Sequence, residues 1–335
     1  MAQAQVLSKS VQAHMHGWKF IIGLVDRKKE NIGYNTFGCE ILEAPIIEPD
    51  VDCLAKKYSL VELNTCLKPS YFQYFFDQYQ ADQVIYLDPD ICLYNPMDEI
   101  EHCFIHDDFI LTPHIITPIP LDGNSPDEPL FLNYGLYNLG FLALKKTSQT
   151  SRFLSWWKDR TYLNGYDKPA AGLFTDQLWI NLVPLYFEKV NILRHQGYNM
   201  APWNLHERHL EKAGDHYYVN SNLPLIFFHF SGFDPGKEKF HKEYSRFKWA
   251  QRADLVSLYK DYKGELEKGN YDSYKSISCY YTSIRNEYLQ AGESIRKQTD
   301  AALYANLPFY KKIIRRLKNF MPVTIKKLAI KLIRT

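Results

Sequence analysis

The chain has 335 residues, of which 46 % are hydrophobic and 23 % are charged, and it carries a formal net charge of +2. These fractions are those of an ordinary globular protein and exclude a disordered, collagen-like or coiled-coil chain. The small net charge by itself implies no polyanionic partner, yet residues 308–335 hold nine Lys or Arg and no acid, which leaves 31 bases against 38 acids elsewhere. An acidic body with a net charge of −7 therefore precedes a strongly basic tail.

Apolar periodicity predicts helices and strands that alternate along the chain. The expected helices are 2–16, 50–79 with an interruption at Pro69, 151–162, 176–184 and mixed-charge segments from 247 onward. The expected strands are 18–26, 83–87, 109–112, 137–144, 190–193 and 225–230, with a further apolar run at 39–47. This alternation predicts an α/β fold, with a mixed, mostly parallel sheet flanked by helices and a helical C-terminal region.

Cysteine usage and the N-terminal sequence both favour a reduced, cytoplasmic protein. The six cysteines are scattered, form no Cys-x-x-Cys pair and stand in hydrophobic surroundings. The first twenty residues lack the apolar core of a signal peptide, and no apolar run reaches the roughly 20 residues that a membrane span requires.

Two carboxylates, Asp88 and Asp90, follow directly on the predicted strand 83–87. Residues two apart in an extended segment point the same way, so both carboxylates would face one spot and repel each other unless a cation lies between them. Mg²⁺ or Mn²⁺ that bridges a diphosphate would meet this need. A turn rich in Asp and Pro at the end of a strand is the competing explanation.

Polar residues also interrupt two later apolar segments. Gly140, two residues after Asn138 in a predicted strand, marks either a close approach of a ligand or a bulge. Thr175 is expected to cap the helix that Asp176 and Gln177 begin, and the helix dipole alone would then explain an acid at this position.

A histidine ends the last predicted strand. His229 stands before Ser231 and Gly232, at an edge where α/β sheets bind ligands, although a lone histidine is more often structural. Taken in order, the segments YLDPDICLY, YNLGFLAL, TDQLWINL and FHFSGFDP resemble the glycosyltransferase family 8 pattern of the GT-A superfamily. The resemblance spans about residues 2–250.

The resemblance implies a role for each matching residue. Asp88 and Asp90 would hold Mn²⁺ or Mg²⁺ on the diphosphate of a nucleotide-sugar donor, and His229 would be the third metal ligand. Asp176 and Gln177 match the Asp-Gln pair beside the donor sugar and are the predicted catalytic residues.

Four further residues are predicted to bind the donor. Asn138 and Gly140 match the strand that lines the sugar pocket. Lys68 stands where such enzymes often place a basic residue, although a solvated lysine before a proline explains it equally well. Lys237 matches a phosphate-contacting lysine only loosely, because HFSGFDPGK departs from the usual HxxGxxKPW ending.

The resemblance implies a metal-dependent hexosyltransferase that acts on a nucleotide-sugar, expected to be a UDP-sugar. The hexose would pass with retention to a saccharide or lipid-linked acceptor in bacterial surface-polysaccharide synthesis. One alternative is a degenerate, membrane-associated sugar-nucleotide-binding protein without activity, because only Met1 precedes the first helix where the family has a strand. The other is a haloacid-dehalogenase-type phosphatase, which would have Thr or Val where Cys92 stands.

The sequence predicts three parts, namely a GT-A domain over 1–250 whose first strand is missing, a helical region over 251–307 and a tail over 308–335. The tail places bases among apolar and aromatic residues at helical spacing, as in helices that lie on anionic membranes. We expect it to hold the protein peripherally at the inner face of the membrane, with a helix packed on the body as the alternative. A nucleic-acid partner is not expected, because no binding module accompanies the charge.

Overall fold

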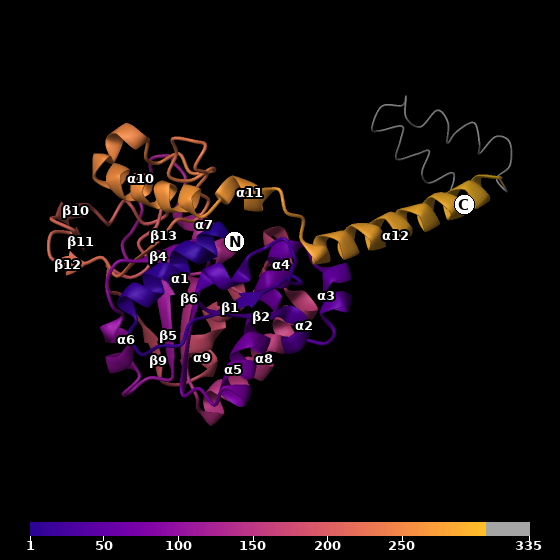
Figure 1. Ribbon diagram of the computed structural model, residues 1–335. Coiled ribbons are helices and arrows are strands. Elements are labelled where there is room, and N and C mark those ends of the chain that lie inside the picture. Colours follow the sequence, from indigo (N-terminus) through magenta and orange to yellow (C-terminus); the bar gives the residue numbers. More distant parts are fainter. Residues whose placement is uncertain (306–335) are drawn as a thin grey trace. The chain divides into compact units, whose positions relative to one another are not determined.

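The computed structural model describes residues 1–305 and divides into two units, Met1–Thr282 and Ser283–Thr335 (Figure 1). The first unit is α/β, with mixed sheets flanked by helices, and the described part of the second continues helix α12 (Tyr280–Ala305). The predicted α/β class, with a mixed sheet and a helical C-terminal region, is confirmed. The basic tail at 308–335, with its predicted amphipathic helix, lies outside the described residues.

A four-stranded sheet forms the centre of the first unit. Its strand order is β3 (Gln83–Leu87), β6 (Tyr137–Lys145), β5 (Phe109–Pro113) and β9 (Val190–Ile192). Smaller sheets pair β1 (Ile21–Leu24) with β2 (Glu40–Glu43), β4 (Ile91–Leu93) with β13 (Phe227–His229), β7 (Asp167–Lys168) with β8 (Leu173–Phe174), and β10 (Leu210–Ala213) with β11 (His216–Val219) and β12 (Leu223–Pro224).

The expectation of mostly parallel pairing is wrong. Within residues 1–305, the parallel pairs are β1 with β2 and β5 with β9, whereas β6 runs antiparallel to both β3 and β5. The connection from β5 to β6, residues 114–136, is long enough for a parallel crossover, so its length does not set the direction of β6. β6 follows the short helix α7 (Glu128–Tyr134) and enters the sheet in the opposite direction to β3 and β5.

Helices precede, separate and follow the strands. They are α1 (Ala2–His14), α2 (Ala44–Ile47), α3 (Val51–Lys57), α4 (Leu60–Cys66), α5 (Lys68–Gln78), α6 (Asp98–Cys103), α8 (Ser148–Asn164), α9 (Val183–Tyr186), α10 (Ala253–Lys268) and α11 (Tyr271–Lys275). Short 3₁₀ turns are η1 (Tyr34–Phe37), η2 (Pro169–Ala171), η3 (Leu178–Leu182) and η4 (Trp249–Gln251).

The predicted helix 50–79 is three helices, because local signals divide it. Ser59 caps α4 with a capping box that it shares with Glu62. Pro69 does not interrupt a helix; it lies in the first turn of α5, where a missing N–H costs nothing. α5 therefore begins at Lys68, close to the end of β3 that carries Asp88.

The central sheet is buried on both faces. Against one face, α5 and α8 pack Phe72, Phe153 and Trp157, and these two helices lie side by side in Figure 1. Against the other, α1 and α6 contribute residues such as Val11 and Ile100. Eight of the nine residues of β6 are consequently buried, so this strand is packed on both faces.

Among residues 1–305, no helix combines the length and the apolar character that a transmembrane span requires. The α10 helix belongs to the first unit, where its residues Leu255, Leu258 and Tyr259 pack in one core cluster with Phe228 and Phe230.

Candidate functional site

Asp88 and Asp90 flank a tight turn between two strands. The Asp88 N–H donates to the Gly140 carbonyl at 2.8 Å, which extends the β3–β6 pairing by one residue. The Ile91 N–H donates to the Asp88 carbonyl at 3.1 Å, and β4 begins there. The turn that the sequence also allowed is therefore present, and it holds both carboxylates, each partly exposed, at the same end of β3.

Strand pairing brings His229 to this turn. β13 runs antiparallel to β4, with His229 opposite Ile91, and the Phe230 N–H donates to the Asp90 carbonyl at 2.9 Å. The His229 Nε2 atom lies 3.0 Å from Asp90 Oδ1 and 3.8 Å from Asp88 Oδ2. One ligand atom from each of these three residues lies within 4.8 Å of the other two.

The three side chains fit a divalent cation. In an octahedral site with metal–oxygen distances of about 2.1 Å, neighbouring ligand atoms are about 3 Å apart and opposite ones about 4 Å apart. The separations of 3.0 and 3.8 Å fall in this range. Two carboxylates and an imidazole are also a donor set that such ions accept.

Burial and neighbouring charges shift the pKa values of Asp90 and His229 in opposite directions. Burial would raise the pKa of Asp90, but the charge of His229 and a hydrogen bond from it lower that pKa below its ordinary value. Burial would lower the pKa of His229, but the charges of Asp90 and Asp88 raise it above its ordinary value. The two acids thus favour positive charge at the His229 ring, as they would favour a cation beside it.

Lys68 is buried beside Asp176 and Asp88, so the alternative that it is a solvated lysine is wrong. Its Nζ lies 3.0 Å from Asp176 Oδ2 and 3.9 Å from Asp88 Oδ1, and it donates to the Leu139 carbonyl at 2.8 Å. The ammonium also lies 4.4 Å from the centroid of the Tyr86 ring. The Lys68 side chain is only 7 % exposed, so its ammonium group is held in one place.

Asp176 faces Lys68 and not the start of a helix. Thr175 does not cap a helix; it has a positive φ of 45°, and its hydroxyl donates to Asp176 Oδ1 at 3.1 Å. The expected helix over 176–184 is the 3₁₀ turn η3, which Gln177 precedes, followed by α9. Burial raises the pKa of Asp176, and the charge of Lys68 opposes this rise. The helix-dipole explanation of Asp176 therefore fails.

Gln177 connects two backbone segments. Its Oε1 accepts from the Leu139 N–H at 2.9 Å, and its Nε2 donates to the Tyr134 carbonyl at 2.8 Å. The side chain of Gln177, the residue directly after Asp176, therefore links β6 to the end of α7.

Asn138 and Gly140 lie behind His229. Asn138 Oδ1 and His229 Nδ1 are 3.2 Å apart, and the Asn138 side chain is buried. The pairing of β6 with β3 is regular from Gln83 to Leu87, whereas its register against β5 shifts between Leu111 and Pro113, so the expected bulge is present on that side of Gly140. The His229 ring lies against the backbone of Gly140, in the space that a side chain at this position would occupy.

Lys237 pairs with a residue outside this group. Its Nζ pairs with Asp234 at 3.3 Å, three residues earlier, and its side chain is 62 % exposed. Eight of the nine predicted site residues thus lie in one connected cluster, and Lys237 does not join it.

The sequence prediction missed two aromatic residues at this cluster. The Tyr86 hydroxyl donates to Asp88 Oδ1, and the period of two along β3 could have revealed it, because Tyr86 stands two residues before Asp88. The Trp203 ring meets His229 edge to face, with centroids 5.1 Å apart and planes at 81°. No local signal identifies Trp203, which lies on a loop.

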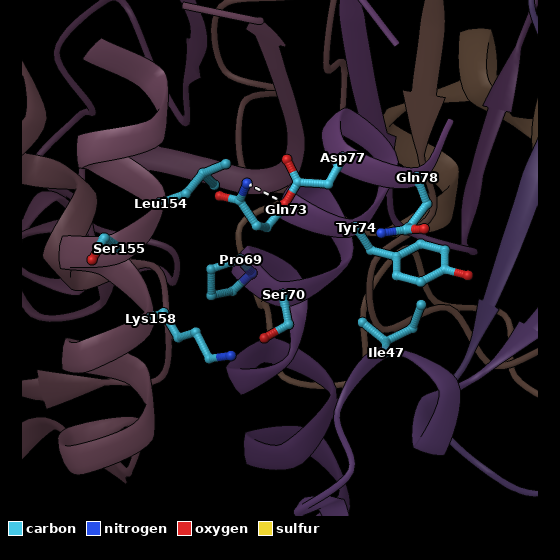
Figure 2. Close-up of a pocket in the computed structure, with 10 residues that line it drawn as sticks. All are labelled: Ile47, Pro69, Ser70, Gln73, Tyr74, Asp77, Gln78, Leu154, Ser155 and Lys158. Carbon is cyan, nitrogen blue, oxygen red and sulfur yellow. Dashed lines mark hydrogen bonds between the residues drawn. The ribbon is translucent and has the colours of Figure 1, made fainter. Parts of the chain in front are cut away.

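A separate pocket of about 370 Å³ lies between α5 and α8 (Figure 2). Its lining residues are Ile47, Pro69, Ser70, Gln73, Tyr74, Asp77, Gln78, Leu154, Ser155 and Lys158. None of the predicted site residues lines it. Within it Gln73 donates to Asp77 at 2.8 Å, and Lys158 pairs with Glu48 at 2.9 Å, so its charges are satisfied locally.

Comparison with curated sequences finds two uncharacterized proteins of Bacillus subtilis (strain 168). The chain is 30 % identical to YfnF over 99 residues, which cover 30 % of this chain and 33 % of YfnF. It is 26 % identical to YfnD over 119 residues, which cover 34 % of this chain and 38 % of YfnD. The chain thus spans a third or slightly more of the length of the curated relatives it matches. No protein-family model matches it.

Comparison with solved structures finds glycosyltransferases at low sequence identity. A crystal structure of the galactosyltransferase LgtC, in complex with donor and acceptor sugar analogues, has a TM-score of 0.44 and 15 % identity, and covers 78 % of this chain and 91 % of that one. Mouse xyloside xylosyltransferase 1, in its apo form, has a TM-score of 0.38 and 16 % identity, and covers 69 % of this chain and 91 % of that one. TM-scores below 0.5 do not assign the chain to a family.

Proposed function

We propose that the protein is a metal-dependent glycosyltransferase of the GT-A type, similar to family 8, that moves a hexose from a nucleotide-sugar, expected to be a UDP-sugar. One observation carries the proposal. Asp88, Asp90 and His229 come from segments far apart in the sequence, and their ligand atoms lie within 4.8 Å of one another. Lys68, Asp176 and Gln177, which the same resemblance singles out, adjoin them.

In this proposal Asp88, Asp90 and His229 hold Mn²⁺ or Mg²⁺. When bound, the ion acts as a Lewis acid that neutralises charge on the departing diphosphate. Backbone hydrogen bonds hold the turn that presents Asp88 and Asp90, and the β4–β13 pairing keeps His229 against it. The site is thereby organised before a donor binds, which is the condition for electrostatic stabilisation of a leaving group.

Lys68 supplies a second fixed positive charge on the donor side. It is held by Asp176 and the Leu139 carbonyl, so it needs no reorganisation when a phosphate approaches. Asp176 and Gln177 are proposed to lie beside the sugar, with Asn138 and Gly140 near it and Lys237 at the phosphates. Retention of configuration would then follow from attack on the face that the diphosphate leaves.

The acceptor in this proposal is a saccharide or a lipid-linked saccharide of bacterial surface-polysaccharide synthesis. We also propose that the protein acts in the cytoplasm at the inner face of the membrane, with the domain limits 1–250, 251–307 and 308–335. The support is the charge of the tail, which holds nine bases and no acid.

The decisive experiment is a donor screen with Mn²⁺ in which released UDP is measured. We expect one UDP-hexose to give UDP release that depends on Mn²⁺ and that disappears in Asp88→Asn. Asp215→Asn, which removes an exposed acid between β10 and β11, outside the cluster, should leave the release unchanged. UDP binding without any release would favour the sugar-nucleotide-binding protein, and cleavage of phosphate esters without UDP-sugar turnover would favour the phosphatase.

A further inference from the structure

We propose that Asn138 and Gly140 form a cradle that orients His229 and keeps the proton of its ring on Nδ1, so that Nε2 is free for a metal ion. This inference rests on the proposed function and deepens it. It makes Asn138 a positioning residue for the metal site, a role that the sequence resemblance does not assign to it.

The Asn138 amide oxygen is fully used inside the protein. Oδ1 accepts from the Gly140 N–H and from the Asn199 Nδ2, both at 3.2 Å, and lies 3.2 Å from His229 Nδ1. A backbone N–H can only donate, so Gly140 fixes which end of the amide is the oxygen. With the oxygen facing it, His229 Nδ1 must carry a hydrogen to complete the contact. In the neutral ring the lone pair then lies on Nε2.

The other end of the amide is also engaged. Asn138 Nδ2 lies 3.3 Å from the His114 Nε2, and Asn138 is only 7 % exposed. A donor sugar would have to compete with these contacts for a side chain that already uses its oxygen and one of its amide hydrogens. The contacts therefore favour a role toward His229.

Gly140 lets the ring lie directly on the backbone of β6. A Cβ at this position would lie 2.3 Å from His229 Cε1, 2.7 Å from His229 Nδ1 and 2.8 Å from Asn138 Oδ1. The Gly140 carbonyl accepts from the Asp88 N–H, so the same residue contacts the histidine and the carboxylate turn. The strand thus sets the distance between His229 and Asp88.

The result is a ring that is held at Nδ1 and whose Nε2 faces the two acids, where a metal ion would take the place of the Nε2 hydrogen. His229 is held through Nδ1 by Asn138, and its Nε2 faces Asp90 and Asp88. Residues that hold the second nitrogen of a metal-binding histidine typically change metal affinity 10- to 100-fold when they are lost.

The test compares three variants of the full chain. Asn138→Asp keeps an acceptor opposite Nδ1, and Asn138→Leu removes it at similar volume. Asn191→Leu is the control, because Asn191 is a partly buried amide on β9 that donates to Asp107, outside the cradle. Mn²⁺ affinity is measured by titration calorimetry without donor. The Nδ1–H of His229 is followed by ¹⁵N NMR without metal, and its signal is assigned by its loss in His229→Gln.

We expect Asn138→Leu to weaken Mn²⁺ binding about 10- to 100-fold and to shift His229 away from the Nδ1–H form. We expect Asn138→Asp to keep that form and Asn191→Leu to change neither property. A wild-type ring without a hydrogen on Nδ1 would overturn the inference. So would an Asn138→Leu variant with normal Mn²⁺ affinity and a normal ring but weaker UDP-sugar binding.

The NMR measurement separates this inference from the proposed function. If the wild-type protein binds no Mn²⁺, the proposed function fails, whereas the Nδ1–H form of His229 and its loss in Asn138→Leu would still establish the cradle. If Asn138→Leu does not fold, Gly140→Ala takes its place, because its methyl group would displace the ring from β6 and should likewise weaken Mn²⁺ binding.

Discussion

At the scale of single residues, the site depends on one buried ion pair whose members come from different elements. Lys68 begins α5, Asp176 precedes η3, and each is almost fully buried. A buried charge is tolerated only while its partner is present, since an unpaired one keeps the full cost of desolvation.

We predict that Lys68→Met destabilises the protein by about 3–5 kcal/mol, because it leaves the Asp176 carboxylate buried without its cation. Urea unfolding measures the change. In the double variant Lys68→Met with Asp176→Asn, part of the loss should be recovered, because no unpaired charge remains. A double variant no more stable than Lys68→Met would show that the ion pair is not the cause.

We predict that Mn²⁺ raises the melting temperature of the wild-type protein and fails to do so in Asp90→Asn. A ligand that binds only the folded state adds about 2.7 kcal/mol at a concentration of 100 Kd. Differential scanning fluorimetry over a Mn²⁺ series measures the shift, and Asp215→Asn should respond like the wild type. An equal response in Asp90→Asn would exclude Asp90 as a ligand.

At the scale of elements, one arginine makes several of the hydrogen bonds that hold the proline-rich loop before α7. The Arg246 guanidinium donates to Asp122 at 2.7 Å, to the Asn124 carbonyl at 3.0 Å and to the Pro126 carbonyl at 3.0 and 3.2 Å. A planar group with several fixed donors can satisfy these acceptors together, and a lysine cannot.

We predict that Arg246→Lys speeds hydrogen exchange in residues 120–128 several-fold and leaves the central sheet unchanged. The physical reason is that lysine keeps the pair with Asp122 but loses the contacts to the loop carbonyls. Mass spectrometry of exchanged peptides is the measurement, and Arg152→Lys on the exposed side of α8 is the control. Unaltered exchange in this loop would mean that other contacts hold it.

The elements that the sequence predicted best are those with a complete local signal. The strand 83–87 is observed with those limits, because an apolar run ends there at an Asp-Pro-Asp turn. The direction of β6 could not be predicted, since pairing depends on contacts remote in the sequence. The prediction that Thr175 caps a helix was wrong, because the fold around this residue, and not its type, decides whether it does so. The cluster of eight site residues followed from motifs, whereas Trp203 and the partners of Asn138 required the fold.

At the scale of the whole molecule, buried neutral histidines make stability depend on pH. Burial lowers the pKa of His114 to about 3 and that of His241 to about 4, against an ordinary value of 6.5. Their folded-state pKa values lie below the unfolded ones, so the unfolded chain binds more protons between pH 6.5 and 4.

We predict that the free energy of unfolding decreases as the pH falls from 6.5 to 4 and that His241→Asn reduces this slope. The His241 Nδ1 accepts from the Glu243 N–H at 3.1 Å, and an Asn side chain can accept a similar bond without taking up a proton. Urea denaturation at a series of pH values tests this. If the free energy of unfolding falls equally steeply with pH in variant and wild type, His241 does not cause the pH dependence.

The division of charge between body and tail is also a property of the whole chain. We predict that a chain ended after Asn306 loses binding to vesicles that contain anionic lipids, while it keeps UDP-sugar hydrolysis. Vesicle sedimentation at low and high salt measures the binding, with neutral vesicles as control. Undiminished binding by the shortened chain would place the membrane contact elsewhere.

The pairing of β4 with β13 has a consequence for biosynthesis. Asp90 and His229 are joined by this pairing, yet 139 residues separate them in the chain. A nascent polypeptide therefore cannot assemble the proposed set of three ligands until residue 229 has left the ribosome and β13 has docked. If the site binds manganese as we propose, the metal slows unfolding of the finished protein and gives little help to the earlier steps of folding.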